Sequence, residues 1–364
     1  MKGLTKIAIL ASVLAFGSGI GGASYAAVPV PITEMKHVKE VNVVESWDKV
    51  FEQNQDVAHE KVQFKNRYGV TLVGDLYMPK SVKEGDKLQA IAIAGPFGAV
   101  KEQVSGLYAQ ELASRGFVTL AFDPSYSGES TDGEVKNIVS SEIYTEDFSA
   151  AVDFLGIQSF VDRDEIGVLG ICGLGGFALN NAAMDTRVKA VATSVMYDMP
   201  RVIQNGYNDS NKDSRESLLK VINEDRWSEA ESGELKDGPR INPEPSENAP
   251  QFIKEYYDYY RTSRGYHERS VNSSGAFKQA SMLSILNTKI NEFSDSINPR
   301  AVLIVAGENA HSRYFSEDAY NALGDNKNKE LYLVPDAVHV DLYDNTEKIP
   351  FHKFSEFFHN NLRK

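Results

Sequence analysis

The amino-acid sequence predicts an α/β protein in which a mostly parallel, doubly wound sheet carries an inserted, mostly helical cap. Short apolar runs alternate with helical patterns over residues 90–198, and the alternation resumes over residues 300–364. Such alternation is typical of parallel sheets whose strands are joined by helices. The intervening residues 199–299 are polar and contain the proline-spaced run PRINPEPSENAP. A structureless loop of that length is improbable inside a compact domain, so this segment is interpreted as a folded cap.

The N-terminus has the pattern of a secretory signal peptide. Lys2 and Lys6 form a positive start, and residues 7–20 are apolar with many small side chains. Ser24-Tyr25-Ala26 supplies small residues at the positions that a signal peptidase reads, so we expect residues 1–26 to be removed after Ala26 and the protein to be periplasmic or secreted. The apolar run is too short and too rich in glycine for a membrane span, although an uncleaved anchor is the alternative.

The composition restricts the classes of partner. The whole chain carries a formal net charge of −13, and loss of Lys2 and Lys6 makes the mature chain more acidic still. An acidic surface argues against nucleic acid and anionic membranes as partners. The single cysteine cannot form an internal disulfide, so the fold depends on its core.

The hydrophobic pattern defines the elements in order along the chain. Residues 27–60 read as a polar leader, residues 61–198 and 300–364 as the sheet core, and residues 199–299 as the cap. The expected strands are 62–64, 70–77, 90–94, 117–122, 166–169, 188–196, 301–306 and 330–334, and the expected helices are 102–115, 144–155, 250–262, 316–323 and 349–362. In the cap helix, the spacing of Tyr256 and Tyr260 would stack the two rings on one face.

One stretch in the middle of the chain predicts a reactive site. Residues 164–181 read DEIGVLGICGLGGFALNN, a buried strand that turns through glycines into a helix. A strand–turn–helix with one reactive side chain among glycines is the layout of a nucleophile elbow, which here presents Cys172. We expect the following helix N-terminus to lower the pKa of this thiol. Leu174 stands where the usual pattern has glycine, and a buried structural cysteine is the alternative interpretation.

A thiol nucleophile needs a base and a residue that orients the base. His339 follows the last strand, and the chain order nucleophile, acid, histidine selects it as the base; a loop histidine bonded to Asp341 is the alternative. The acid is less well defined, because the usual position after the late strand is occupied by Ala310. Asp198, just past the preceding strand, is the favoured acid, and Glu308 is the second choice.

The stabilisation of an oxyanion requires two backbone N–H groups. One should come from Gly173, directly after the nucleophile, and the other from the GPFG loop that follows the strand 90–94. Pro96 has no N–H group, so Phe97 is the candidate. No metal-ligand spacing or phosphate-binding loop stands out, so no cofactor and no metal are expected.

Several blocks together resemble a known family. These are GICGLGG, AGPFG, FDPSYSGES, MYDMPRV, YYDYYRTSRGYHERS, AGENAHSRYFSEDAY and HVDLYD. They are similar to the YcjY-like group of α/β-hydrolases, which is related to dienelactone hydrolases, and the similarity runs from about Val62 to Leu362. The resemblance implies the α/β-hydrolase fold, with Cys172 as nucleophile and His339 as histidine. Related fungal proteins act as acyl transferases.

The residues and the resemblance together predict an exported, cofactor-independent hydrolase of an ester, thioester or lactone. Cys172 would attack the carbonyl of a small-molecule acyl substrate, His339 would shuttle the proton, and the tyrosine-rich cap would shape an aromatic or apolar acyl pocket. Acyl transfer at the same site is one alternative. A catalytically inactive binding protein that kept the fold is the other, and the absence of an obvious acid favours it.

Overall fold

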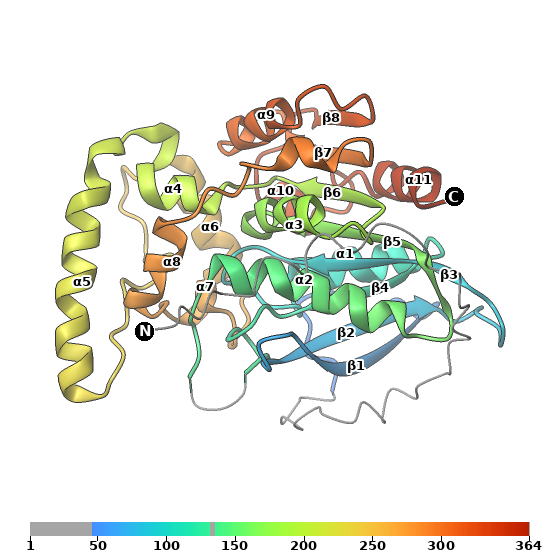
Figure 1. Ribbon diagram of the computed structural model, residues 1–364, viewed down its shortest axis with the longest axis horizontal. Helices are drawn as coiled ribbons and strands as arrows, with labels where there is room; N and C mark the ends of the chain where they lie inside the picture. Colours follow the sequence, from blue (N-terminus) through green and yellow to red (C-terminus); the bar gives the residue numbers. More distant parts are fainter. Residues whose placement is uncertain (1–45, 132–134, 364) are drawn as a thin grey trace, which may run out of the picture.

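The protein folds around a single eight-stranded sheet, as seen in a computed structural model that describes residues 46–131 and 135–363 (Figure 1). The expected signal peptide, residues 1–26, lies outside the described residues. The strand order is β1-β2-β4-β3-β5-β6-β7-β8. The strands are β1 (Val57–Lys65), β2 (Thr71–Pro79), β3 (Leu88–Ala94), β4 (Val118–Phe122), β5 (Val161–Ile171), β6 (Ala190–Ser194), β7 (Ala301–Gly307) and β8 (Lys329–Val334). Pairs that include β1 or β2 are antiparallel and the others are parallel, which confirms the predicted mostly parallel sheet.

Helices cover both faces of the sheet. Helices α1 (Val104–Ala113) and α11 (Phe351–Leu362) pack on one face, while α2 (Ser141–Gly156), α3 (Gly173–Met184) and α9 (Arg313–Ala322) pack on the other. Strand β3 shows the consequence for the sequence: its alanines join the core beneath α2 and α3, and its isoleucines join the core beneath α1 and α11. A strand buried on both faces reads as a continuous apolar run, which is why the sequence identified it.

The segment between β6 and β7 folds as a cap made largely of helices. It contains α4 (Met199–Asn205), α5 (Arg215–Ser232), α6 (Gln251–Arg261), α7 (Val271–Ser274) and α8 (Met282–Leu286), with short 3₁₀ turns at Tyr207–Asp209, Lys212–Ser214, Gln279–Ser281 and Ser294–Ile297. Figure 1 shows α5, coloured yellow-green, standing at the far edge of the cap, with α4, α6 and α8 between it and the sheet. Helix α6 was expected from its sequence and α5 was not.

The observed strands extend some of the predicted boundaries. All eight predicted strands are found, but β1 already begins at Val57, so the expected leader 27–60 overlaps the sheet. Val57 is buried, and its pairing with Pro79 continues the hairpin beyond the residues predicted from alternation. The carboxyl ends of β3, β5, β6, β7 and β8 all meet at the edge beneath the cap, and their loops carry the candidate site.

Candidate active site

Cys172 lies at the apex of the predicted strand-to-helix turn. β5 ends at Ile171 and α3 begins at Gly173, and Cys172 between them has φ 52° and ψ −122°. Residues other than glycine rarely adopt this backbone conformation, so the neighbouring structure must hold Cys172 in it. The Cys172 N–H group donates to the Ser194 carbonyl at 2.9 Å, and its carbonyl accepts from the Tyr197 N–H group at 2.8 Å. The expected elbow geometry is therefore present.

The glycine after the nucleophile is required by close packing. A Cβ atom on Gly173 would lie 2.8 Å from the Met199 Cγ atom and closer still to Phe97. Leu174 replaces the glycine of the usual pattern without disturbing the turn, because its side chain is buried in the core beneath α2 and α3. The close approach occurs instead at Gly175 of α3, where an added Cβ would lie 2.6 Å from Met196 Cβ, in the segment that follows β6.

Two backbone groups lie within hydrogen-bonding range of the nucleophile and lower the pKa of its thiol. The N–H groups of Gly173 and Phe97 both hydrogen-bond to Cys172. These are the two donors expected for an oxyanion hole, and they come from the start of α3 and from the loop after β3. A carbonyl oxygen next to the sulfur would lie within reach of both donors.

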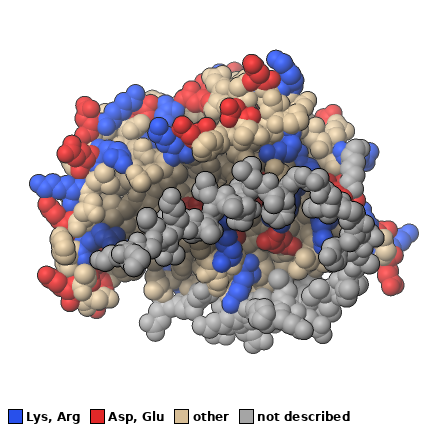
Figure 2. Space-filling view, viewed as in Figure 1, with Lys and Arg blue, Asp and Glu red and all other residues tan. Residues whose placement is uncertain are grey.

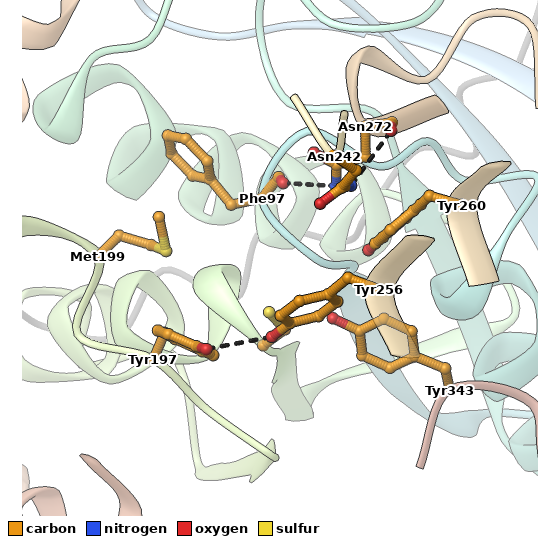
Figure 3. Close-up of a pocket in the computed structure, with 9 residues that line it drawn as sticks. Phe97, Tyr197, Met199, Asn242, Tyr256, Tyr260, Asn272 and Tyr343 are labelled. Atoms are coloured by element: carbon orange, nitrogen blue, oxygen red, sulfur yellow. Dashed lines mark hydrogen bonds between the residues drawn. The ribbon is translucent and has the colours of Figure 1, made fainter. Parts of the chain in front are cut away.

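The cap holds the loop that supplies the second donor. Asn272 donates from its side chain to the Phe97 carbonyl at 2.8 Å, and its N–H group donates to the Gly98 carbonyl at 3.1 Å (Figure 3). Ser270 donates to the same Gly98 carbonyl at 2.9 Å. Gly98 has φ 85°, and an added Cβ would lie 2.6 Å from the Asn272 side-chain oxygen. The cap therefore fixes the loop conformation that aims the Phe97 N–H group.

A buried ion-pair cluster anchors the far end of this loop. Lys101 is fully buried, and its ammonium lies 2.9 Å from Asp123, 2.6 Å from Glu129 and 2.7 Å from Glu102. Asp123 also accepts the N–H groups of Lys101 at 2.7 Å and Glu129 at 3.0 Å, so it ties two loops together. Removal of one partner from such a buried cluster leaves an uncompensated charge, which typically costs about 3–5 kcal/mol.

The hydroxyl group of Tyr343 lies between His339 and the nucleophile. The His339 Nε2 atom lies 3.1 Å from the Tyr343 hydroxyl, and that hydroxyl also hydrogen-bonds to Cys172. The Nδ1 atom lies 2.6 Å from the Ser312 hydroxyl, and the imidazole is fully buried. When Tyr343 donates to Nε2, the Nδ1–H group donates to Ser312, so one tautomer satisfies both contacts. The structure thus forms a continuous chain of hydrogen-bonding groups from the thiol to Ser312.

The carboxylates considered for the triad lie elsewhere. Asp198 caps the N-terminus of α4 by accepting the Arg201 N–H group at 2.9 Å, and it accepts Asn291 at 3.2 Å. The expected pairing of Asp198 with His339 is therefore not what the structure shows. The second choice, Glu308, is exposed and accepts the backbone of Asp336.

The alternative partner proposed for the histidine, Asp341, is also engaged elsewhere. Its carboxylate accepts the Val338 N–H group at 2.9 Å and the Lys348 ammonium at 2.7 Å. These contacts fix the turn that leads into α10 (Asp341–Asp344) and so place Tyr343 beneath the site. Asp341 therefore supports the position of the tyrosine rather than the charge of His339.

A second imidazole reaches the nucleophile through two tyrosines. The His311 Nε2 atom lies 2.5 Å from the Tyr197 hydroxyl and 3.4 Å from the Tyr256 hydroxyl. Tyr256 donates to Tyr197 at 3.1 Å (Figure 3). Its hydroxyl also hydrogen-bonds to Cys172. The His311 ring stacks on Phe252 of the cap helix α6, with ring centroids 4.3 Å apart. Core and cap therefore both contribute groups on this side of the sulfur.

Burial determines the protonation of the site. Burial raises the pKa of Cys172 to about 11, although its hydrogen bonds with Tyr343 and with the backbones of Gly173 and Phe97 oppose the shift. The expected lowering of the thiol pKa is therefore wrong, because desolvation outweighs the helix N-terminus. Burial also lowers the pKa of His311 to about 4 and holds the pKa of His339 well below its usual value. Thiol and both imidazoles are neutral near pH 7.

The nucleophile opens into a small cavity between core and cap. The cavity has a volume of about 170 Å³ and is rich in aromatic side chains. Figure 3 shows the rings of Tyr256, Tyr260 and Tyr343 gathered on one side of it, with Phe97 and Met199 on the other. Its walls are Phe97, Cys172, Tyr197, Met199, Asn242, Tyr256, Tyr260, Asn272 and Tyr343. Tyr256 and Tyr260 come from α6, as their spacing predicted.

Charged side chains of both signs lie on the described surface (Figure 2). In Figure 2, acidic and basic side chains are interspersed over the visible described surface. Across residues 46–131 and 135–363, no three His, Cys, Asp or Glu residues gather in a way that could hold a metal ion. The same residues include no helix that is long and apolar enough to cross a membrane.

Sequence reasoning missed Ser312 and Tyr343, which contact His339, and it also missed the cavity residues Tyr197, Met199, Asn242 and Asn272. Ser312 stands in the loop after β7, the same loop that was searched for an acid, but two positions beyond Ala310. Tyr343 follows His339 by four residues, a spacing that places two side chains on one face of a helical turn. The motif H-x-x-x-Y after the last strand was therefore the available signal.

Proteins similar to this chain are found in bacteria and in fungi. No family model matches the chain. The uncharacterized protein PA2218 of Pseudomonas aeruginosa is 53% identical over 324 residues, which cover 89% of this chain and 86% of that protein. The uncharacterized protein YcjY of Escherichia coli is 33% identical over 288 residues, which cover 78% of this chain and 92% of that protein. The thiohydrolase aneE of Aspergillus aculeatus is 33% identical over 138 residues, 38% of this chain and 42% of that protein.

Solved structures agree on the fold. The crystal structure of PA2218 has a TM-score of 0.85 at 52% sequence identity, and the alignment covers 89% of this chain and 99% of that chain. The α/β-hydrolase GrgF from Penicillium has a TM-score of 0.69 at 22% identity, with coverage of 84% and 99%. The order and direction of the strands around Cys172 are thus those of an α/β-hydrolase sheet.

Proposed function

Because the chain belongs to the YcjY-like group of the α/β-hydrolase superfamily, we propose that it hydrolyses an ester, thioester or lactone through an acyl-enzyme on Cys172. One observation carries this proposal. Cys172 lies at the apex of the elbow, and the backbones of Gly173 and Phe97 both hydrogen-bond to it. A buried structural cysteine has no need of two converging backbone donors, whereas a developing oxyanion does.

In the first step the Cys172 sulfur forms a bond to the acyl carbonyl carbon. The carbonyl π electrons move to the oxygen, which becomes an oxyanion held by Gly173 and Phe97. The thiol proton passes to the Tyr343 oxygen while the Tyr343 proton passes to His339 Nε2, so the tyrosine is neutral before and after. This relay fits the raised thiol pKa, because a free thiolate is not required before attack.

Collapse of the oxyanion breaks the bond to the alcohol or thiol leaving group. The proton held on His339 returns through Tyr343 to that leaving group, which departs neutral. A water molecule then attacks the acyl carbon and passes a proton through Tyr343 to His339; collapse of the second oxyanion breaks the bond between carbon and sulfur, returns that proton to Cys172 and releases the carboxylic acid. In each half of the cycle Ser312 accepts the His339 Nδ1–H group and holds the imidazole in one tautomer. In this proposal Ser312 takes the orienting role that sequence reasoning gave to Asp198.

Acyl transfer is the second candidate, and the burial of the nucleophile favours it. Only 7% of Cys172 is exposed, and the cavity around it is small and aromatic. An alcohol or amine acceptor that fills this cavity would exclude water from the acyl-enzyme. The partial match to a protein named a thiohydrolase is compatible with an acyl thioester as the donor.

Intact mass spectrometry of the protein treated with p-nitrophenyl esters and thioesters tests the proposal. We expect a transient acyl adduct on the wild type, no adduct on C172A, and slower adduct formation on H339A. Faster decay of the adduct when alcohols or amines are added, with formation of their esters or amides, would select acyl transfer. If no ester modifies a thiol shown to be reduced, the acyl-enzyme mechanism is wrong and the protein binds ligands without chemistry.

We also propose export, on the basis of the N-terminal pattern alone. The mass of the protein recovered from a cell fraction outside the cytoplasm should correspond to cleavage after Ala26. Recovery of the full-length chain from the cytoplasm would contradict this proposal.

A further inference from the structure

A second and larger cavity lies beside the nucleophile pocket. It has a volume of about 410 Å³, within the range of small-molecule sites. The cap contributes most of its walls, including Ile203 of α4, Ile222 of α5 and Met282 of α8. Ile222 is only 2% exposed, so this part of the cavity lies beneath the outermost helix of the cap.

The two cavities share part of their walls. Phe97, Met199 and Asn272 line both of them. Phe97 carries an oxyanion donor on its backbone, and its ring packs against Phe277 of the second cavity with centroids 4.9 Å apart. Figure 3 shows Phe97 and Met199 on the side of the nucleophile pocket away from Tyr256, Tyr260 and Tyr343. A group bound at the oxyanion donors is therefore next to the wall that the two cavities share.

The lining of the second cavity selects for hydrocarbon. Most of its walls are Ile, Leu, Met, Phe and Pro side chains, and none of the lining side chains is charged. Its polar side chains already have partners in the protein: Asn272 donates to the Phe97 carbonyl, and Gln279 donates to Asp225 at 2.8 Å. The cavity therefore offers little to a polar ligand, whereas burial of methylene groups there is favourable.

We propose that this cavity binds the hydrocarbon chain of the acyl group carried by Cys172, an inference that rests on the function proposed above. The acyl carbonyl lies at Gly173 and Phe97, the chain runs past Met199 into the cap, and the leaving group or acceptor lies on the tyrosine side. A methylene group is close in size to a water molecule, whose share of the liquid is about 30 Å³, so a cavity of about 410 Å³ has room for a chain of at most roughly fourteen carbons.

A series of p-nitrophenyl esters from acetate to laurate measures this preference. Each buried methylene should raise the kcat/KM of acylation by roughly fourfold until the cavity is full. In I222W the indole fills part of the cavity, so octanoate should lose at least about tenfold in kcat/KM while acetate changes little. V221W is the matched control, because Val221 is the preceding residue on α5 but is 52% exposed. It should retain the wild-type series.

A binding measurement separates this inference from the chemistry. Calorimetry with C172A, which cannot be acylated, should show that octanamide binds much more tightly than acetamide, and that I222W in the same background removes the difference. If Cys172 is not acylated but octanamide still binds in this way, the proposed function fails and the hydrocarbon site stands.

Results that would overturn the inference are equally defined. Rates that are independent of chain length on an acylated wild type, or octanamide binding equal to that of acetamide, would show that the cavity is not an acyl site. If I222W does not fold, M282W fills the cavity from α8 instead, and the wild-type series decides the question without any variant.

Discussion

Replacement of Tyr343 by phenylalanine tests whether the thiol and the imidazole communicate through a hydroxyl group. The change removes the hydroxyl oxygen, which hydrogen-bonds to Cys172 and lies 3.1 Å from His339 Nε2. The ring should stay in place, because it packs edge-on against Tyr259 at a centroid distance of 5.0 Å and against His339 at 5.2 Å. The loss is therefore confined to the proton path.

The magnitude follows from the step that is removed. A positioned proton-transfer group contributes about 10²–10⁴ in rate, so the acylation rate of Y343F should fall by that factor, equivalent to about 3–5 kcal/mol of barrier. Unpairing the buried His339 nitrogen should also lower the free energy of unfolding by about 1–3 kcal/mol. The two effects are separable because the first is a rate in the folded protein.

The assay is single-turnover release of p-nitrophenol from a short ester, at a temperature where the variant is folded. Y259F is the matched control, because Tyr259 is also buried and its ring belongs to the same cluster, yet it does not line the nucleophile pocket. An acylation rate of Y343F within about threefold of wild type would refute the relay and imply direct contact between His339 and the thiol in the reacting state. A faster rate would show that the hydroxyl blocks the nucleophile.

Four further predictions follow from the geometry and protonation of the site. With a pKa of about 11, Cys172 should react with iodoacetamide roughly tenfold faster per pH unit between pH 7 and 10, and a plateau near neutral pH would contradict the raised value. D198N should acylate within about threefold of wild type, since Asn is an equally good helix cap, whereas loss of a triad acid would cost about 10⁴ in rate. S312A should lower the free energy of unfolding by about 1–3 kcal/mol in a urea titration, because it leaves the buried His339 Nδ1 atom unpaired. The pKa of His311 is lowered to about 4, so between pH 6.5 and 4 the unfolded chain binds a proton that the folded chain does not. The free energy of unfolding of wild type should therefore fall by about 3 kcal/mol more than that of H311F between pH 7 and 4.

The central strands of the sheet could be predicted because they are buried on both faces. Runs such as Ala90–Ala94 contain no polar side chain and are fully buried in the structure. The elbow was equally visible, since its glycines are required by contacts such as that of Gly173 with Met199. Helix α5 was missed because it lies at the edge of the cap and, of its residues, only Ile222 and Glu229 are buried. A helix with so narrow an apolar face gives no periodic signal.

The candidate site was only partly predictable, because strand ends locate loops but not the contacts of their side chains. Cys172 and Phe97 follow directly from strand ends, and the structure brings them together. Asp198 also follows a strand end at the correct edge, yet an aspartate before a helix has a competing role as its cap, and that role prevails here. Tyr343 and Ser312 reach His339 from separate loops, a contact that only the folded chain defines.

The pKa of the thiol was mispredicted for a physical reason that bears on the mechanism. A helix N-terminus stabilises a thiolate by a modest free energy. Transfer of the charged thiolate from water into a fully enclosed site costs far more free energy. The buried thiol is therefore neutral at rest, and since the thiolate is the species that reacts with oxidants, it resists sulfenic acid formation. The same burial keeps His339 unprotonated and able to accept a proton. Reactivity then depends on a substrate whose carbonyl reaches the Gly173 and Phe97 donors, because only the developing oxyanion makes transfer of the proton to His339 favourable.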